Sequence, residues 1–112
     1  MGRIYAGKTA TSQFNILVMK HLQISVFGKV QGVFFRASAK AVADMLGVRG
    51  RVINQPDGSV YIEAEGDEFS LEEFLAFCHQ GPEKSQVEKV LVNEAELKNY
   101  RNFEITKKLV KT

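Results

Sequence analysis

The chain has 112 residues, of which 45% are hydrophobic and 25% charged, as is ordinary for one globular domain. It contains neither a signal-peptide pattern nor an apolar run near the roughly 20 residues that cross a bilayer, so we expect no membrane partner. The net charge of +2 comes from Arg3 and Lys8, because the other 13 basic residues are matched by 13 acidic ones. Nucleic-acid binding normally draws on a clustered basic excess, so we expect no nucleic-acid partner either.

Residues 1–18 show no sustained periodicity, and we expect them to be a flexible N-terminal extension of a domain that spans 19–112. Within them, Gly2–Thr9 (GRIYAGKT) matches the phosphate-loop pattern G-x-x-x-x-G-K-[ST]. That loop works only between a buried strand and a helix. Here a single Met precedes it and Ala10–Ser12 begin no helix, so we expect no phosphate binding at this match.

A strand and a helix follow the extension. His21–Lys29 alternates with period two, which predicts a strand with Leu22, Ile24 and Val26 on one face. A helix is expected to begin near Phe34 or Phe35, and its inner stripe is Phe35, Ala39, Val42 and Leu46. Gly47 is a natural helix end, and Val48-Arg49 read as a short link to Gly50.

The next segment predicts a hairpin. Arg51–Ile53 and Ser59–Glu65 flank Asn54–Gly58 (NQPDG), in which Pro fixes φ and Gly accepts a positive φ. Along the second strand, alternation places Val60, Ile62 and Ala64 on the buried face. The acidic residues of this strand and of the turn after it, Glu63, Glu65, Asp67 and Glu68, are expected on a solvated edge.

A second helix and two more strands complete the pattern. Ser70 and Glu73 form a capping-box sequence, with Phe69 and Phe74 spaced as a hydrophobic staple. The buried stripe is predicted to be Leu71, Phe74, Leu75 and Cys78, and Gly81-Pro82 ends the helix. Strands are expected at Val87–Asn93 and Phe103–Thr106. The resulting order predicts an α+β, ferredoxin-like βαββαβ sandwich with two helices on one face of a mostly antiparallel sheet and a short extra C-terminal strand.

Metal and thiol chemistry are not indicated. His21 and His79 fall on different elements, and no His, Cys or Asp pair has a ligand spacing, so we expect no metal and no cofactor. Cys78 lies on the apolar stripe of the second helix, where a core position is the simpler interpretation. As the single cysteine it forms no internal disulfide, which fits a reducing cytoplasm. We expect a cytoplasmic monomer.

The stretch Gly28–Arg36 (GKVQGVFFR) carries the most chemistry. Gly28 and Gly32 permit backbone conformations closed to other residues. Arg36 falls in the first helical turn, where the helix dipole disfavours a cation by a few tenths of a kcal/mol unless an anion joins it. Free N–H groups at a helix N-terminus and a forked guanidinium together suit a phosphate. A glycine-rich loop with a solvated arginine remains the alternative.

Asn54 is the candidate partner of that loop. In this topology the first and third strands are central neighbours and the second pairs with the third, so the end of the second strand can lie beside the loop after the first. Asn54 is either a turn-starting asparagine or a neutral group that holds a water with its amide donor and its carbonyl acceptor.

Together these motifs resemble the acylphosphatase family. GKVQGVFFR is followed eighteen positions after Arg36 by Asn54, within G-R-V-I-N-x-x-D-G-S-V. Gly81-Pro82 and the ending Tyr100-x-x-Phe103-x-Ile105 also match, and the resemblance extends from about His21 to Lys107. The family has the fold inferred above. The resemblance implies hydrolysis of the carboxyl–phosphate bond of small acyl phosphates, giving a carboxylate and inorganic phosphate without a metal or cofactor.

The same resemblance implies roles for individual residues. Arg36 would bind the phosphate and Asn54 would orient the attacking water. The backbone N–H groups that would help to bind the substrate are those of Gln31, Gly32, Val33, Phe34 and Phe35. One departure is Arg51, which stands where the family usually has an aromatic residue. It leaves local packing and acyl-group preference open.

Two other functions remain as hypotheses. One is a non-catalytic module of the same family that binds a phosphorylated or carbamoylated ligand or a partner protein. The other is a small RNA-binding domain that stacks bases on Phe27 and Tyr61. The second is disfavoured because the sequence pattern of such domains is missing and the predicted folded part carries no net charge.

Overall fold

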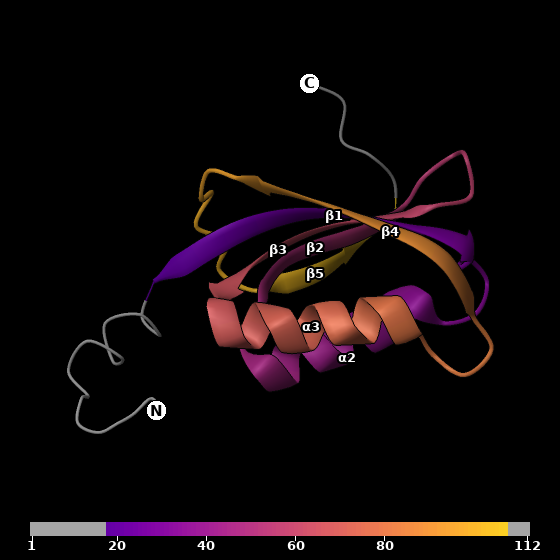
Figure 1. The fold of residues 1–112 in the computed structure, drawn as a ribbon, viewed down its shortest axis with the longest axis horizontal. Coiled ribbons are helices and arrows are strands. Elements are labelled where there is room, and N and C mark those ends of the chain that lie inside the picture. Colours follow the sequence, from indigo (N-terminus) through magenta and orange to yellow (C-terminus); the bar gives the residue numbers. More distant parts are fainter. Residues whose placement is uncertain (1–17, 108–112) are drawn as a thin grey trace.

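The computed structural model describes residues 18–107. The phosphate-loop match at Gly2–Thr9 and nearly all of the predicted extension lie outside these residues. The elements are β1 (Met19–Lys29), α2 (Phe35–Leu46), β2 (Arg49–Asn54), β3 (Val60–Asp67), α3 (Glu68–Gln80), β4 (Gln86–Ala95) and β5 (Phe103–Thr106). The strands form one sheet in the order β4-β1-β3-β2-β5, and both helices cover the same face of it (Figure 1). The predicted α+β, ferredoxin-like fold is confirmed.

The middle of the sheet is the antiparallel pair β1–β3. It runs from Met19 opposite Asp67 to Val26 opposite Val60. The other side of β1 pairs with β4, and β3 pairs with β2, both antiparallel. Strand β5 adds to β2 in parallel. The predicted neighbour relations of the first three strands are therefore confirmed.

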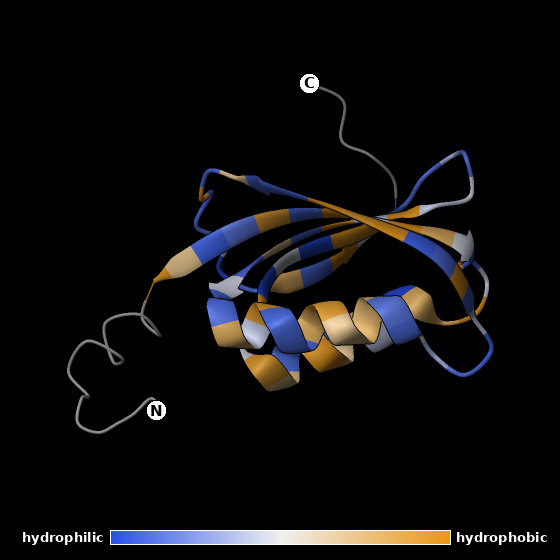
Figure 2. Cartoon of the chain, in the orientation of Figure 1, coloured by the Kyte–Doolittle hydropathy of each residue, from blue (hydrophilic) through white to orange (hydrophobic). Residues whose placement is uncertain are grey.

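The core lies between the sheet and the two helices. Hydrophobic and hydrophilic residues alternate along the strands, as Figure 2 shows, and the apolar ones on one face pack against the helices. The buried helix residues are Phe35, Ala39 and Ala43 of α2 and Leu71, Phe74 and Cys78 of α3. Burial raises the pKa of the Cys78 thiol to about 12, so it is a core residue, as predicted, and not a reactive thiol. Neither α2 nor α3 has the length and hydropathy that a membrane-spanning helix requires.

The start of α3 differs from the prediction. The helix begins at Glu68, and its N-cap is Asp67, whose carboxylate accepts the backbone N–H of Ser70 at 2.8 Å. The predicted cap at Ser70 is wrong, and Phe69 is 67% exposed and packs in no staple. A carboxylate both satisfies a free N–H group and complements the positive end of the helix, which explains why the helix begins earlier.

Strand β2 also begins earlier than expected, at Arg49 instead of Arg51, so Arg49 does not belong to a link. Gly50 makes this possible. Its φ is +147°, and a Cβ atom there would lie 1.7 Å from the carbonyl oxygen of Glu63. Only glycine lets β2 pass this close to β3 while the pairing continues.

The outer face of the sheet, away from the helices, corrects a second prediction. Glu63 and Glu65 were expected on a solvated edge, but each is only 2% exposed. The β4–β5 connection, residues 96–102, covers them. Its backbone N–H groups at Lys98, Asn99 and Tyr100 all donate to the Glu65 carboxylate, which also contacts Nδ1 of buried His21 at 2.6 Å. Glu65 is therefore the anchor of that connection.

Glu63 completes the same outer-face cluster. It accepts hydrogen bonds from the guanidinium of Arg51 (3.0 Å) and the hydroxyl of Tyr100 (3.1 Å), and it pairs with the ammonium of Lys98 (3.1 Å). Burial opposes ionisation of Glu63, but the hydrogen bonds from these partners outweigh it and hold the pKa of Glu63 below its usual value. The pKa of Glu65 is lowered in the same way, with burial again opposing and the bonds from His21 and the backbone prevailing.

These two carboxylates predict an acid-sensitive fold. Because the pKa values are lower in the folded protein than their ordinary 4.5, the unfolded chain binds more protons. The stabilisation is complete above that value and is lost as pH falls through the lower folded-state values. Urea unfolding between pH 7 and pH 3 should therefore show stability decreasing below about pH 5.

A variant of the anchor tests the origin of that effect. Glu65→Gln removes one partner of a buried pair, so it should cost about 3 kcal/mol at pH 7 and flatten the loss in acid. The matched control is Glu88→Gln, an exposed position on β4, which should change stability by less than about 0.5 kcal/mol. Equal stability of the two variants at pH 7 would contradict the assigned role of Glu65.

Candidate active site

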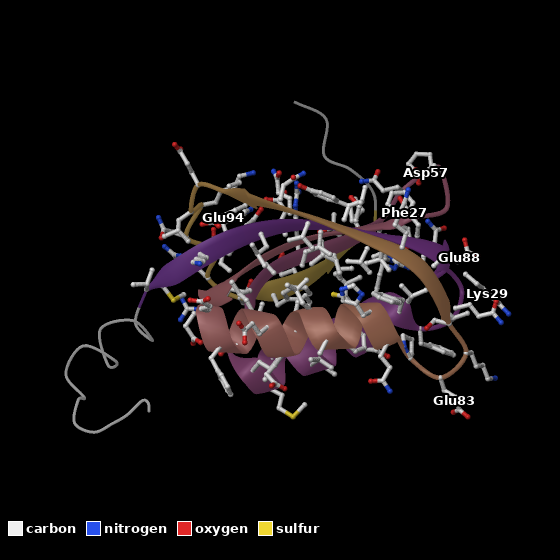
Figure 3. The ribbon with its side chains drawn as sticks, viewed as in Figure 1. Phe27, Lys29, Asp57, Glu83, Glu88 and Glu94 are labelled. Atoms are coloured by element: carbon white, nitrogen blue, oxygen red, sulfur yellow. The ribbon has the colours of Figure 1, made fainter. Side chains whose placement is uncertain are left out.

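A cavity of about 290 Å³ opens at the end of the sheet where the β1–α2 loop and the β2–β3 turn meet. In Figure 3, Asp57 of that turn and Lys29 at the end of β1 lie at this end of the molecule, and Glu94 lies toward the other. The cavity is lined by Val30, Gly32, Phe34, Phe35, Arg36, Ala37, Asn54 and Ile105. The fold therefore brings Arg36 and Asn54 to one cavity, as the sequence predicted.

The β1–α2 loop has an unusual backbone. Gly28 and Gly32 have φ values of 126° and 73°, as their positions predicted. Phe34, although not a glycine, is also left-handed, with φ 65° and ψ 24°. This conformation costs a side-chain-bearing residue about 1–2 kcal/mol, and such strain gathers at functional sites. Left-handed residues within a turn aim successive N–H groups into one concavity, which is an anion-binding arrangement.

The N–H groups of this loop are unused within the described chain. Among residues 18–107, the amides of Gln31, Gly32, Val33 and Phe34 donate to no other backbone group. Helix α2 has no side-chain cap and no acidic residue in its first turn, so its first N–H groups are open as well. The first bond into the helix is donated by Ser38 to the carbonyl of Phe34 at 3.0 Å. The result is a positive helix end that faces the cavity.

Arg36 lies in the first turn of α2 and is partly buried. Its Nη1 donates a long hydrogen bond, 3.5 Å, to the carbonyl of Thr106 in β5. No carboxylate of residues 18–107 forms an ion pair with it. The guanidinium therefore keeps most of its donors free for an anion in the cavity.

Asn54 ends β2 and also lines the cavity. Its Oδ1 is buried and has no hydrogen-bond partner among the described residues. A buried polar atom left unpaired costs about 1–3 kcal/mol, so a native protein keeps one only where another need requires it. Because Asn54 lines the same cavity as Arg36, its side-chain amide is a candidate for positioning a water molecule there.

The Gln31 side chain forms contacts of its own, separate from the backbone N–H that is predicted to bind an anion. Its Nε2 donates to the carbonyl oxygens of Gln55 and Ser59, both at 2.8 Å. This amide therefore joins the β1–α2 loop to the β2–β3 turn. No local sequence pattern indicates this contact, because the two segments are more than twenty positions apart.

Some of the predicted site residues line the cavity, and others do not. Gly32, Phe34, Phe35, Arg36 and Asn54 line it. Gln31 and Val33 do not, and Val33 is 5% exposed in the core, so both could reach an anion only through the backbone. Val30, Ala37 and Ile105 line the cavity without having been predicted, because an apolar residue gives no chemical signal in a sequence.

Comparison with known proteins identifies the family. Residues 22–105 match the model of the acylphosphatase family. The chain belongs to the acylphosphatase family. The acylphosphatase of Archaeoglobus fulgidus is 48% identical over 84 residues, which are 75% of this chain and 94% of that protein. The crystal structure of acylphosphatase from Bacillus subtilis superposes with a TM-score of 0.76 at 36% identity, over 80% of this chain and 99% of that one. This membership makes the chain an acylphosphatase hydrolase.

A longer protein contains a similar unit. Full-length HypF, crystallised in a phosphate- and nucleotide-bound form, matches with a TM-score of 0.76 and 34% identity. The match covers 81% of this chain but 12% of HypF. The acylphosphatase fold is therefore also found as part of a larger chain.

The departure at Arg51 lies away from the cavity. Its guanidinium is bound to Glu63 on the outer face of the sheet, and Arg51 is not a lining residue. Its effect is therefore on the packing of the outer-face cluster.

Within residues 18–107, no three His, Cys, Asp or Glu side chains are grouped to hold a metal ion.

The strained position predicts a contrast between two variants of Phe34. Its side chain is 75% exposed, so Phe34→Gly keeps the left-handed backbone and should change stability by less than about 1 kcal/mol. Phe34→Val places a β-branched residue in this region and should cost about 1–2 kcal/mol. It should also weaken phosphate binding about tenfold by distorting the N–H groups. Thermal unfolding and phosphate titration measure both effects. Weaker binding by the glycine variant than by the valine variant would contradict a backbone role.

Proposed function

We propose that this protein hydrolyses the carboxyl–phosphate bond of small acyl phosphates by direct attack of water on phosphorus. Family membership supports acyl phosphate hydrolysis in general. The observation that carries the finer proposal is the placement of Arg36 and the buried, unpaired Oδ1 of Asn54 on one cavity at an open helix N-terminus. The products are a carboxylate and inorganic phosphate.

The phosphate is held by the loop and by Arg36. The N–H groups of the five residues before Arg36, Gln31 to Phe35, surround its oxygens, and the guanidinium binds two of them side by side. Phosphoryl transfer requires mostly positioning and stabilisation of charge on the three equatorial oxygens. A preorganised set of amides and one guanidinium supplies both, so the reaction needs no resident metal or cofactor.

Water is oriented by Asn54. Its Oδ1 accepts one hydrogen of the water, which turns an oxygen lone pair toward phosphorus. The new bond forms between the water oxygen and phosphorus, and the bond from phosphorus to the acyl oxygen breaks with its electron pair. That oxygen leaves as a carboxylate, which is stable without protonation. The proton of the water passes to the product phosphate, so the neutral Asn54 never has to accept it.

We infer a catalytic unit of residues 19–112 with residues 1–18 as an extension outside it, acting as a cytoplasmic monomer. The single cysteine, buried at Cys78, supports a reducing compartment. Small acyl phosphates and inorganic phosphate are the partners, and the balanced charge of residues 19–112 speaks against nucleic acid.

A second candidate is a non-catalytic phosphate- or partner-binding module. The observation in its favour is the similar unit that forms 12% of the HypF chain. The two proposals differ in one result, because a module would bind phosphate in a titration and leave an acyl phosphate intact.

The experiment is a rate measurement with benzoyl phosphate in the presence of a chelator. Wild-type protein should turn over, and Arg36→Ala and Asn54→Ala should each lose about 10²–10³ in kcat, the usual cost of removing one donor of a preorganised site. Matched controls are Arg101→Ala and Asn93→Ala, both exposed and outside the cavity. Undiminished turnover by Arg36→Ala would overturn the mechanism, and phosphate binding without wild-type turnover would favour the module.

A further inference from the structure

The proposed reaction requires a fixed distance between two segments that are not joined by the sheet. The β1–β3 ladder ends at Val26 opposite Val60. Beyond that pair, β1 continues into the loop with the N–H groups, and the chain before Val60 is the β2–β3 turn that follows Asn54. The relative position of the N–H groups and the water-orienting side chain must therefore be set by other contacts.

The Gln31 side chain supplies that contact. Both hydrogens of its amide are used, one on the carbonyl of Gln55 and one on the carbonyl of Ser59. Among residues 18–107, these are the hydrogen bonds that connect the segment 30–34 with the turn 55–59. The same residue lends its backbone N–H to the proposed phosphate site, so one residue connects the two halves of the cavity.

The turn itself makes this contact effective. Gln55 donates its N–H to Ser59 (2.9 Å), and Gly58 donates to Gln55 (3.1 Å), so the two carbonyls that Gln31 binds are already part of a closed turn. Gln55 directly follows Asn54, and Ser59 directly precedes Val60, the residue opposite Asn54. Gln31 therefore holds the hairpin one residue beyond the Asn54–Val60 pair, on both strands.

Asn54 depends on this support because its own oxygen has no partner among the described residues. A side chain whose oxygen makes no hydrogen bond is placed by its backbone and by packing. We propose that the Gln31 side chain is a positioning residue, which sets the distance between the phosphate-binding N–H groups and Asn54. This inference rests on the proposed function, since it assigns Gln31 an effect on catalysis exerted through Asn54.

The predicted signature is a loss in kcat without a comparable loss in phosphate binding. Gln31→Met keeps the length of the side chain and removes its donors, so the water should be misplaced and kcat should fall about 10- to 100-fold. The inhibition constant of inorganic phosphate should change by less than about threefold, because Arg36 and the N–H groups remain. Gln31→Leu is a second uncharged variant that also cannot donate, and it should behave alike.

A matched control separates positioning from general stability. Ser85→Ala removes a side-chain bond to the carbonyl of Pro82 (2.7 Å), and neither residue lines the cavity. Its kcat should stay within about twofold of wild type even if its melting temperature falls as far as that of Gln31→Met. Circular dichroism confirms that each variant is folded.

The deciding measurement is a double-mutant cycle. If Gln31 acts through Asn54, then Gln31→Met in the Asn54→Ala background should lower kcat by less than about twofold, because no oriented water is left to misplace. The same full loss in both backgrounds, unchanged kcat in the single Gln31 variants, or a phosphate constant that weakens as much as kcat falls would each overturn the inference. Wild-type kcat in Asn54→Ala alone would instead overturn the proposed function, so the two failures are distinguishable.

Discussion

The antiparallel pairing of β1 with β3 holds both halves of the cavity in place. Because the two strands run in opposite directions, the end of β1 and the start of β3 lie at the same end of the sheet. The loop that leads to Arg36 and the turn that follows Asn54 are attached there. One geometric relation thus assembles the cavity from segments distant in the sequence, and the burial of β1 and β3 in the sheet centre keeps it rigid.

This structure has two groups of polar residues that differ in whether their polar atoms have partners within the protein. On the outer face, Glu63 and Glu65 are surrounded by donors from His21, Arg51 and the connection 96–102, so their charges are compensated within the protein. At the cavity, the N–H groups of the β1–α2 loop and the Oδ1 of Asn54 have no such partners among residues 18–107. A compensated group stabilises the fold, whereas a group left open can stabilise a ligand instead. That contrast is the physical reason for placing the chemistry at Arg36 and Asn54.

The sequence predicted what local patterns determine. Strand alternation, the helical stripe and the NQPDG turn indicated the fold, and Arg36 in a first helical turn indicated the candidate anion site. Prediction from the sequence failed where contacts with a segment far along the chain determine whether a residue is buried or bonded. Glu65 is buried because the connection 96–102 folds over it. The hydrogen bonds of the Gln31 side chain likewise depend on the distant turn that contains Gln55. The N-cap error at Asp67 had another cause, since two residues three positions apart, Asp67 and Ser70, both suit a cap.

Oxygen-isotope labelling distinguishes attack of water on phosphorus from attack on the carbonyl carbon. Hydrolysis of benzoyl phosphate by the enzyme in H₂¹⁸O, followed by mass spectrometry of both products, shows which bond is broken. We expect one ¹⁸O atom in the inorganic phosphate and none in the benzoate, because in the proposed mechanism Asn54 directs the water toward a phosphate bound by Arg36. Label in the benzoate would mean attack on the carbonyl carbon and would contradict it.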